Sequence, residues 1–438
     1  MTETQSHKRM KLSSTNNPTE GMVKTEVAAV DRMTHNPVIL QNIFGFLSPA
    51  ELKCAALVCR TWCHVLQLPR FWSWAAVSLN KENFCERTDS RRFRSIRRVL
   101  IGFDVSEVEW RSLFLTARCR NMRSLSLSRA DLSSVSPGLL SRAAVRLERV
   151  ECRHTFLSSL QISALFSEIL ETRPLTLRTL KLAHTSLASV PPSVLARAVV
   201  RLEEFPLLNS ANLSTEQINC VLGEIEASQE VRLRKVRFHH LDLSSVPPHV
   251  FSQAVLRLED VDLYASHLTE QQIEALLVKI GSSEQVEVRS VRVVSKEASS
   301  PLLLHLSPTV LAQALVRLET VNITNFILSP EQGKAVFKAV VSCPGLKLSR
   351  LTIVAGLYLL FAKRCEDYLA GALARLERVN ILGVCFKPKV AAAICQKIVA
   401  NETLKLKSLK LWKSQDFPVS DELLKKVKER INLDFAQV

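Results

Sequence analysis

The residue types that perform catalysis or bind metals occur in this sequence without the spacings that such chemistry requires. No G-x-G-x-x-G, G-x-x-x-x-G-K-[ST], H-E-x-x-H or G-x-S-x-G motif is present. Those motifs place backbone amides around phosphates, two imidazoles on one zinc ion, or a serine nucleophile on a sharp turn. We therefore expect no catalytic activity, no metal and no cofactor in this chain.

Histidine and cysteine residues come close together at two places. His239 and His240 follow a strand-like stretch, where a surface turn explains them better than a metal site. Cys59 and Cys63 are four residues apart with His64 adjacent, a spacing that could bring them to one face of a helix. Packing of the helix explains these cysteines better than a metal ion does.

The eleven cysteines bear on the compartment. Their number is odd and no C-x-x-C pair occurs, although disulfide frameworks and most structural zinc sites need paired cysteines. The sequence thus favours a reducing environment, and we expect the protein in the cytoplasm, the nucleus or both. The longest apolar stretch, residues 353–362, is too short to cross a bilayer, so we expect no membrane partner.

The chain is strongly basic. Lys and Arg number 58 against 42 Asp and Glu, for a formal net charge of +16, which favours acidic or otherwise anionic partners. Residues 87–129 hold eleven Arg and four acids, and Arg binds carboxylate or phosphate in a bidentate manner. A solvated basic linker explains the same excess. The candidate target-binding residues in this region are Arg94, Arg97, Arg98, Arg120 and Arg123.

The N-terminal part of the chain changes character near residue 35. Residues 1–34 are polar and lack a sustained apolar period, so we interpret them as a disordered tail. Residues 35–76 are predicted to form three short helices, the second capped by Ser48 and begun by Pro49. A module of this size cannot bury all of its apolar surface by itself. Either the rest of the chain or a partner is therefore expected to cover the remaining apolar surface.

This segment resembles an F-box. The matching pattern is Pro37-x-x-Leu40-x-x-Ile43-Phe44-x-x-Leu47, Glu51-Leu52, Leu57-Val58-Cys59-Arg60-x-Trp62 and Pro69-x-Phe71-Trp72. Asn36 departs from the family, which usually has Leu before the proline, and this could weaken the first contact. By resemblance, the segment docks on the Skp adaptor of a cullin–RING ubiquitin ligase. The residues that the resemblance assigns to this contact are Pro37, Leu40, Ile43, Phe44, Leu47, Leu52, Val58, Cys59 and Trp62.

From about residue 96 to the end, the sequence repeats. An L-x-x-L-x-L pattern, with other aliphatic residues allowed, starts twelve times at intervals of 25–31 residues. The starts are Ile96, Met122, Leu147, Leu177, Leu202, Leu233, Leu258, Val288, Leu318, Leu348, Leu376 and Leu406. The triplet Arg-Leu-Glu recurs in alternate units, so the units form pairs. This arrangement is similar to the leucine-rich repeats of the ribonuclease-inhibitor class.

Each unit is predicted to be a strand, a turn and a helix. Capping boxes introduce the helices of one unit type and prolines introduce those of the other. The capping boxes are Ser158/Gln161, Ser214/Gln217, Thr269/Gln272 and Ser329/Gln332, and the prolines are Pro192, Pro248 and Pro308. Stacked units of this kind form an α/β solenoid, a horseshoe with a parallel sheet inside and helices outside.

The expected organisation has four parts. They are the disordered tail (1–34), the F-box (35–76), a basic linker (77–95) and a solenoid of about twelve repeats (96–438) that residues 421–431 close as a capping helix. The ninth position of the repeats departs from the family, which has Asn there. Thr155, Thr185 and Ser210 take this position, and their hydroxyl groups could form a shorter version of the family's hydrogen-bond ladder.

The outward positions of the predicted strands alternate in charge. The strands of the Arg-Leu-Glu units carry nine acids and two bases, and the strands between them carry eleven bases and no acid. Parallel strands lie about 4.8 Å apart, so opposite charges should face each other. The near balance favours a self-neutralising ladder over a charged floor for a substrate peptide. The expected pairs include Glu148/Arg178, Glu259/Arg289 and Asp262/Arg292.

The pattern and the resemblance predict a substrate receptor of an SCF-type E3 ubiquitin ligase. The F-box would bind the Skp adaptor and so the cullin scaffold, and the repeats would bind an acidic or phosphorylated target for ubiquitination and proteasomal degradation. One alternative is a basic repeat scaffold that binds RNA or another polyanion, and another is a ligase-bound scaffold without a turnover substrate. Aromatic residues are only 6% of the chain, which disfavours RNA because its bases stack on aromatic rings.

Overall fold

The computed structural model describes residues 36–66, 68, 71, 76–82, 84, 96–115, 121–208, 212–283, 286–297, 300–354, 366–382, 388–412 and 419–436. The predicted tail (1–34) and most of the predicted linker (77–95) therefore lie outside the described residues.

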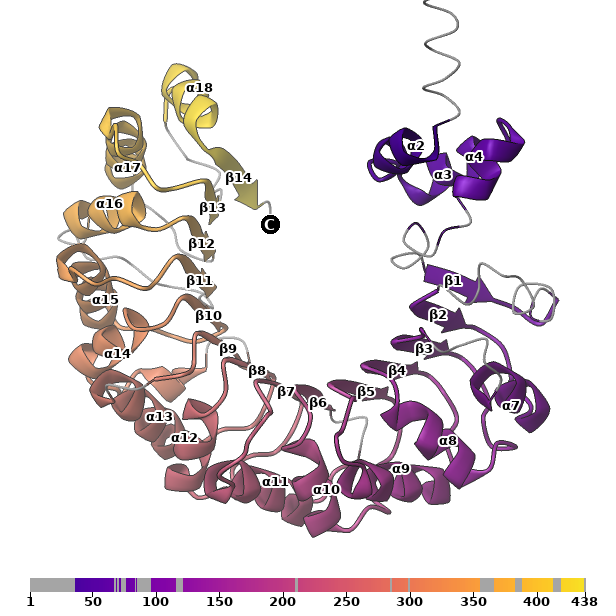
Figure 1. Ribbon diagram of the computed structural model, residues 1–438. Helices are drawn as coiled ribbons and strands as arrows, with labels where there is room; N and C mark the ends of the chain where they lie inside the picture. Colours follow the sequence, from indigo (N-terminus) through magenta and orange to yellow (C-terminus); the bar gives the residue numbers. More distant parts are fainter. Residues whose placement is uncertain are drawn as a thin grey trace, which may run out of the picture.

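One sheet of fourteen parallel strands runs through the molecule, and its strands follow one another in sequence order. It lines the inside of an arc (Figure 1). The strands are β1 (Ala76–Leu79), β2 (Arg98–Ile101), β3 (Ser124–Ser128), β4 (Arg149–Arg153), β5 (Thr179–Ala183), β6 (Glu204–Leu208), β7 (Lys235–His239), β8 (Asp260–Tyr264), β9 (Ser290–Val294), β10 (Thr320–Thr324), β11 (Arg350–Val354), β12 (Arg378–Leu382), β13 (Ser408–Trp412) and β14 (Asn432–Ala436).

Helices connect the strands and form the outside of the arc (Figure 1). They are α7 (Glu107–Leu115), α8 (Pro137–Val145), α9 (Ser159–Glu171), α10 (Pro192–Val199), α11 (Thr215–Ala227), α12 (Pro248–Leu256), α13 (Glu270–Ser282), α14 (Pro308–Leu315), α15 (Pro330–Ser342), α16 (Glu366–Arg375), α17 (Pro388–Ala400) and α18 (Asp421–Arg430), with the 3-10 turn η4 (Pro301–Leu303). The predicted α/β solenoid is confirmed.

Each of the twelve predicted pattern starts yields one strand, which begins two residues after the start. The alternate residues of a strand point into the layer between sheet and helices, as Val236 and Phe238 of β7 do, both 1% exposed or less. This follows from the period of two in a strand. One continuous hydrophobic core results, which extends from the N-terminal helices to Leu433 of β14.

Two strands were not predicted. Residues 77–79, which the sequence analysis placed in the linker, belong to β1, and Ala76 of β1 pairs in register with Arg98 of β2. The closing helix is present as α18, but β14 follows it and extends the sheet beyond the predicted cap. Both strands lack a full L-x-x-L-x-L pattern, so periodicity did not reveal them.

The predicted helix starts are confirmed. All four capping boxes form; in the second, Ser214 N donates to Gln217 Oε1 at 2.9 Å and Gln217 N to Ser214 Oγ at 3.1 Å. The three prolines of the alternate units each stand at the first position of their helix, α10, α12 and α14. A proline is tolerated there because that position has no intrahelical N–H bond to lose.

The hydroxyl groups at the ninth repeat position behave unequally. Thr155 Oγ1 donates to the Leu127 carbonyl of the preceding unit at 3.3 Å, as the ladder prediction requires. Thr185 Oγ1 is buried without a hydrogen-bond partner among the described residues, and Ser210 lies outside them. The ladder is therefore partial in the region that the structure describes.

Candidate functional site

Three short helices stand at the N-terminal end of the arc (Figure 1). They are α2 (Pro37–Phe44), α3 (Pro49–Ala55) and α4 (Arg60–Val65). Asn36, the departure from the F-box pattern, caps α2, because its Oδ1 accepts a hydrogen bond from Val38 N at 2.9 Å. Helices of this length are not stable alone in water, so packing between them must hold the module together.

The interior of this module is built from the predicted apolar residues. Leu40, Phe44 and Leu52 are 1% exposed or less. The Phe44 and Trp62 rings pack in a T-shaped arrangement with centroids 5.0 Å apart, a favourable aromatic geometry. Leu40, Phe44 and Leu52 thus shape the module from within, and their side chains are not available on its surface.

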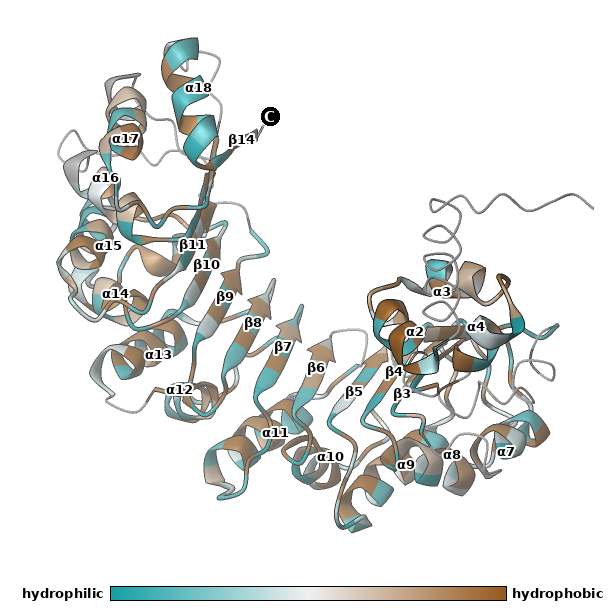
Figure 2. Cartoon of the chain, turned by 45° about the horizontal axis from the view of Figure 1, so that its top comes forward, coloured by the Kyte–Doolittle hydropathy of each residue, from teal (hydrophilic) through white to brown (hydrophobic). Residues whose placement is uncertain are grey.

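Other apolar side chains of the module are exposed. They come from α2 and from the two connections between the helices, and Figure 2 shows the hydrophobic colours on α2. Large apolar groups left in water beside buried ones such as Leu40 and Phe44 are typical of a docking surface. The exposed fractions are 66% for Val38, 51% for Ile43, 90% for Phe46, 86% for Leu57 and 62% for Val58.

The predicted adaptor-binding set therefore divides by burial. Pro37, Ile43 and Val58 are exposed, Leu47, Cys59 and Trp62 are half-buried, and Leu40, Phe44 and Leu52 are buried. The set omitted Val38 and Phe46, which fall on variable positions of the F-box pattern, and Leu57, which belongs to the pattern but was not assigned to the contact. High apolar content at the turns between the helices was the available signal.

The cysteine and histidine groups have structural explanations. Cys59 caps α4, with its Sγ accepting a hydrogen bond from Trp62 N at 3.5 Å. His240 adopts a left-handed backbone conformation (φ 56°) directly after β7, which is the turn that the sequence predicted. No cluster of three metal-ligating side chains occurs in the described part of the chain. Burial raises the pKa of the Cys152 thiol to about 12, so this thiol stays protonated at neutral pH.

Charged side chains cover the concave face of the sheet, as predicted. Asp262 pairs with Arg292 at 3.3 Å, which confirms one expected pair. The other two expected pairs also lie opposite each other on neighbouring strands, where Arg178 N donates to Glu148 O and Arg289 N to Glu259 O, but their side chains form ion pairs with other residues. Glu148 pairs with Arg123 of the preceding strand at 2.6 Å instead of Arg178, and Glu259 pairs with Arg234 instead of Arg289. An acidic residue on an inner strand has a basic residue on each of the two neighbouring strands. The sequence does not determine which of the two its side chain contacts.

The middle of the concave face holds the least exposed charges. Lys181 bridges Glu151 at 3.5 Å and Glu204 at 3.0 Å, and both carboxylate side chains are only 15% exposed. Asp262, also 15% exposed, contacts His239 Nε2 at 3.1 Å in addition to Arg292. Opposite charges therefore pair in the middle of the face, although Asp262 Oδ1 and Arg292 Nε are buried without a hydrogen-bond partner among the described residues.

The predicted N-terminal arginine cluster is only partly described. Arg98 begins β2, Arg97 directly precedes β2 and Arg123 directly precedes β3, so the sheet brings these three side by side. The ion pair with Glu148 already engages Arg123. Arg94 and Arg120 lie outside the described residues. The structure therefore gives this cluster no defined binding geometry.

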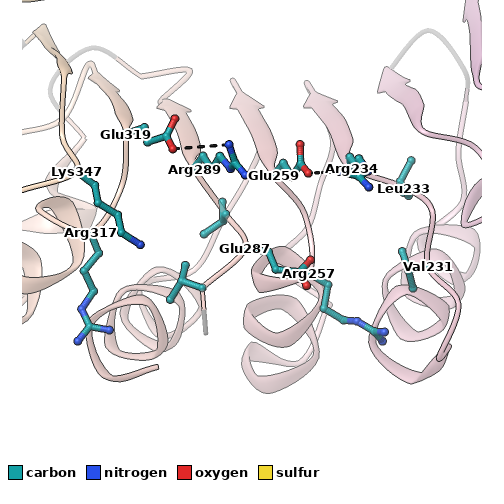
Figure 3. A pocket seen from close by; sticks show the side chains of 12 residues that line it. Val231, Leu233, Arg234, Arg257, Glu259, Glu287, Arg289, Arg317, Glu319 and Lys347 are labelled. Atoms are coloured by element: carbon teal, nitrogen blue, oxygen red, sulfur yellow. Dashed lines mark hydrogen bonds and ion pairs between the residues drawn. The ribbon is translucent and has the colours of Figure 1, made fainter. Parts of the chain in front are cut away.

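A groove of about 610 Å³ lies at the lower edge of the concave face, beside β7 to β10 (Figure 3). The ion pairs Arg234–Glu259 and Arg289–Glu319 line one side of it. Arg257, on the other side, donates to the Ile225 carbonyl at 2.8 Å and so serves α11. The groove is the charged edge of the repeats and offers no nucleophile paired with a general base.

Comparison with known proteins assigns a family to the N-terminal module alone. Residues 37–76 match the F-box-like family model. A solved structure, described as a crystal structure of the Rad7 and Elc1 complex in yeast, is similar to this chain with a TM-score of 0.45 and 13% identity, over 96% of this chain and 98% of that one. No curated protein sequence matches this chain. No helix in the described ranges has the length and apolarity needed to span a membrane.

Proposed function

We propose that this chain is the substrate-recognition subunit of an SCF-type E3 ubiquitin ligase. The observation that carries the proposal is the exposed apolar surface of the F-box-like module, above all Phe46 and Leu57, which are 90% and 86% exposed. Such side chains on a filled module are typical of a surface that a partner covers. For an F-box-like sequence the expected partner is a Skp-type adaptor, which links the subunit to the cullin scaffold.

The proposed mechanism needs no bond chemistry from this chain. The module fixes the subunit to the ligase, and the concave face of the solenoid holds a target protein. The lysines of that target then meet activated ubiquitin at a high effective concentration, which promotes transfer and later proteasomal degradation. We expect this subunit to act in the cytoplasm, the nucleus or both.

Charged substitutions on the exposed apolar surface test the proposal. Phe46→Asp combined with Leu57→Asp should abolish co-purification of a recombinant Skp-type adaptor with the full chain, because a buried interface tolerates unpaired carboxylates poorly. The melting temperature should change little, since both side chains are exposed in the free chain.

The matched control is Val108→Asp combined with Leu160→Asp. These residues are 77% and 74% exposed but belong to the solenoid, so this variant should retain the adaptor. Equal adaptor recovery with both double variants would contradict the proposal. If the chain instead binds random RNA at physiological salt and recruits no adaptor, the polyanion-binding alternative gains support.

A further inference from the structure

The first residues of the strands form a row along the concave face, and strand register decides which of them are neighbours. In β11 and β12, the register places Arg350 directly opposite Arg378. Both side chains are exposed. Among the register pairs of the described sheet, this is the one pair of like charge.

Equivalent pairs in the other repeats avoid this arrangement. They join opposite charges, or a charged residue and a hydroxyl, or two neutral residues, because like charges directly opposite each other in a sheet are unfavourable. From β3 to β14 these pairs are Ser124/Arg149, Thr179/Glu204, Lys235/Asp260, Ser290/Thr320 and Ser408/Asn432.

The nearby acids do not neutralise the two arginines. Glu319 of the preceding unit pairs with Arg289 at 3.8 Å, and Glu377, next to Arg378, pairs with Lys407 at 3.4 Å. Neither Arg350 nor Arg378 has a carboxylate within 4.0 Å in the described part of the chain. Two positive charges thus lie side by side on this face without a carboxylate partner among the described residues.

The surroundings of the pair supply hydrogen-bonding groups without charge. Thr320 and Ser408 flank it in the same row of the sheet. The next outward row carries Thr352 and Asn380 on the same two strands, with Asn380 Nδ2 donating to Thr352 Oγ1 at 3.2 Å. A bound anion would therefore meet donors and no competing carboxylate on these strands.

We propose that Arg350 and Arg378 form a binding site for a phosphoryl group on a target polypeptide. Two guanidinium groups carry two positive charges and bind oxyanions in a bidentate manner, which matches the charge of about −1.5 to −2 and the three acceptor oxygens of a phosphate monoester. A single carboxylate would leave one charge uncompensated. This proposal rests on the proposed function only because the phosphoryl group is assigned to a protein target. It places phosphate binding at β11 and β12 and not at the N-terminal arginine cluster.

Peptide libraries test the site directly. The full chain should retain immobilised degenerate peptides with a fixed central phosphoserine and should not retain the same peptides with serine. Arg350→Ala and Arg378→Ala should each weaken retention about tenfold or more, since each removes charge-assisted hydrogen bonds. The control, Arg178→Ala with Arg234→Ala, removes two arginines of the same face that are paired with Glu203 and Glu259, and it should bind normally.

A second measurement separates binding from folding. Arg378→Glu places opposite charges at the pair, so the melting temperature should rise or hold while phosphopeptide retention is lost. The inference is overturned if this variant melts lower, if phosphorylated and plain libraries are retained alike, or if the paired-arginine control loses as much. The inference also fails if Arg350→Ala and Arg378→Ala weaken binding of random RNA but do not weaken binding of any phosphopeptide. Adaptor recovery, measured on the same variants, should be unchanged, so failure here is distinct from failure of the adaptor proposal.

Discussion

At the scale of single residues, the buried glutamines of the capping boxes do more than close their own helices. Each side-chain amide also donates to two backbone carbonyls of the preceding unit. For Gln272 the acceptors are Leu243 O at 2.6 Å and Val246 O at 2.7 Å, while its Oε1 accepts from Thr269 N at 2.8 Å. The glutamine therefore joins two repeats, and burial makes each of these bonds costly to lose. The same pattern holds for Gln161, Gln217 and Gln332.

Substitution of Gln272 should be strongly destabilising. Gln272→Ala leaves two buried carbonyls and one N–H without a partner and opens a cavity, so the free energy of unfolding should fall by about 3 kcal/mol or more. Denaturant unfolding of the full chain measures this change. The neighbouring Gln271 is exposed, and Gln271→Ala should change the free energy by less than about 0.5 kcal/mol. A similar small change in both variants would show that the glutamine does not join the repeats.

At the scale of secondary-structure elements, the arginine of the Arg-Leu-Glu triplet caps a helix. Its guanidinium lies at the C-terminal end of the long helix of the preceding unit and donates to carbonyls that have no intrahelical partner. Arg430 repeats this contact for the last long helix without belonging to a triplet. The donors and acceptors are Arg201 to Ile169, Leu170 and Thr172; Arg257 to Ile225 and Glu226; Arg317 to Ser283; Arg375 to Val340, Val341 and Cys343; and Arg430 to Ile398, Val399 and Asn401.

The first triplet offers a natural control for this cap. Arg146 occupies the same sequence position as Arg257 but makes no side-chain hydrogen bond to a described residue. Arg257→Met should lower the free energy of unfolding by about 2 kcal/mol, because loss of the charged guanidinium leaves two part-buried helix carbonyls without a donor. Arg146→Met should have little effect on the same measurement. Equal losses would mean that the arginine acts through packing of its aliphatic stem and not through the cap.

At the scale of the whole molecule, charge alternates along the concave face, and single ion pairs contribute little to stability. Arg234 and Glu259 illustrate this, with side chains 62% and 30% exposed. Glu259→Lys places like charges together and should lower the free energy of unfolding by about 1 kcal/mol. Reversing both residues, Arg234→Glu with Glu259→Lys, should restore most of this loss.

The neighbouring Glu287 is an exposed acid with no ion pair to a described residue, so Glu287→Lys makes the same charge change without breaking a pair. Its unfolding free energy should stay near that of the unaltered chain. Failure of the double reversal to restore stability would contradict a ladder that depends only on opposite sign. Loss of a bound target with the fold intact would instead assign this part of the face to binding.

Much of the fold could be predicted from residues that are close in the sequence. The leucine pattern located twelve of the strands, and Ser214 with Gln217 marked a helix start, because these features depend on contacts within one unit. β1 and β14 escaped prediction because they end the stack, where a strand needs to match a neighbour on one side only. Phe46 and Leu57 were missed as surface residues because exposure depends on how three helices pack together.

The sequence alone determined that this chain is a basic solenoid behind an F-box-like module, since local periodicity, caps and charge alternation need no knowledge of distant contacts. Only the tertiary structure decided which charges meet. Arg350 and Arg378 are 28 residues apart, and the sequence does not show that the acids near them, Glu319 and Glu377, pair with other residues. Stacking of the repeats puts their backbones in register, and the neighbours of each strand then determine whether a charge is neutralised or left for a ligand.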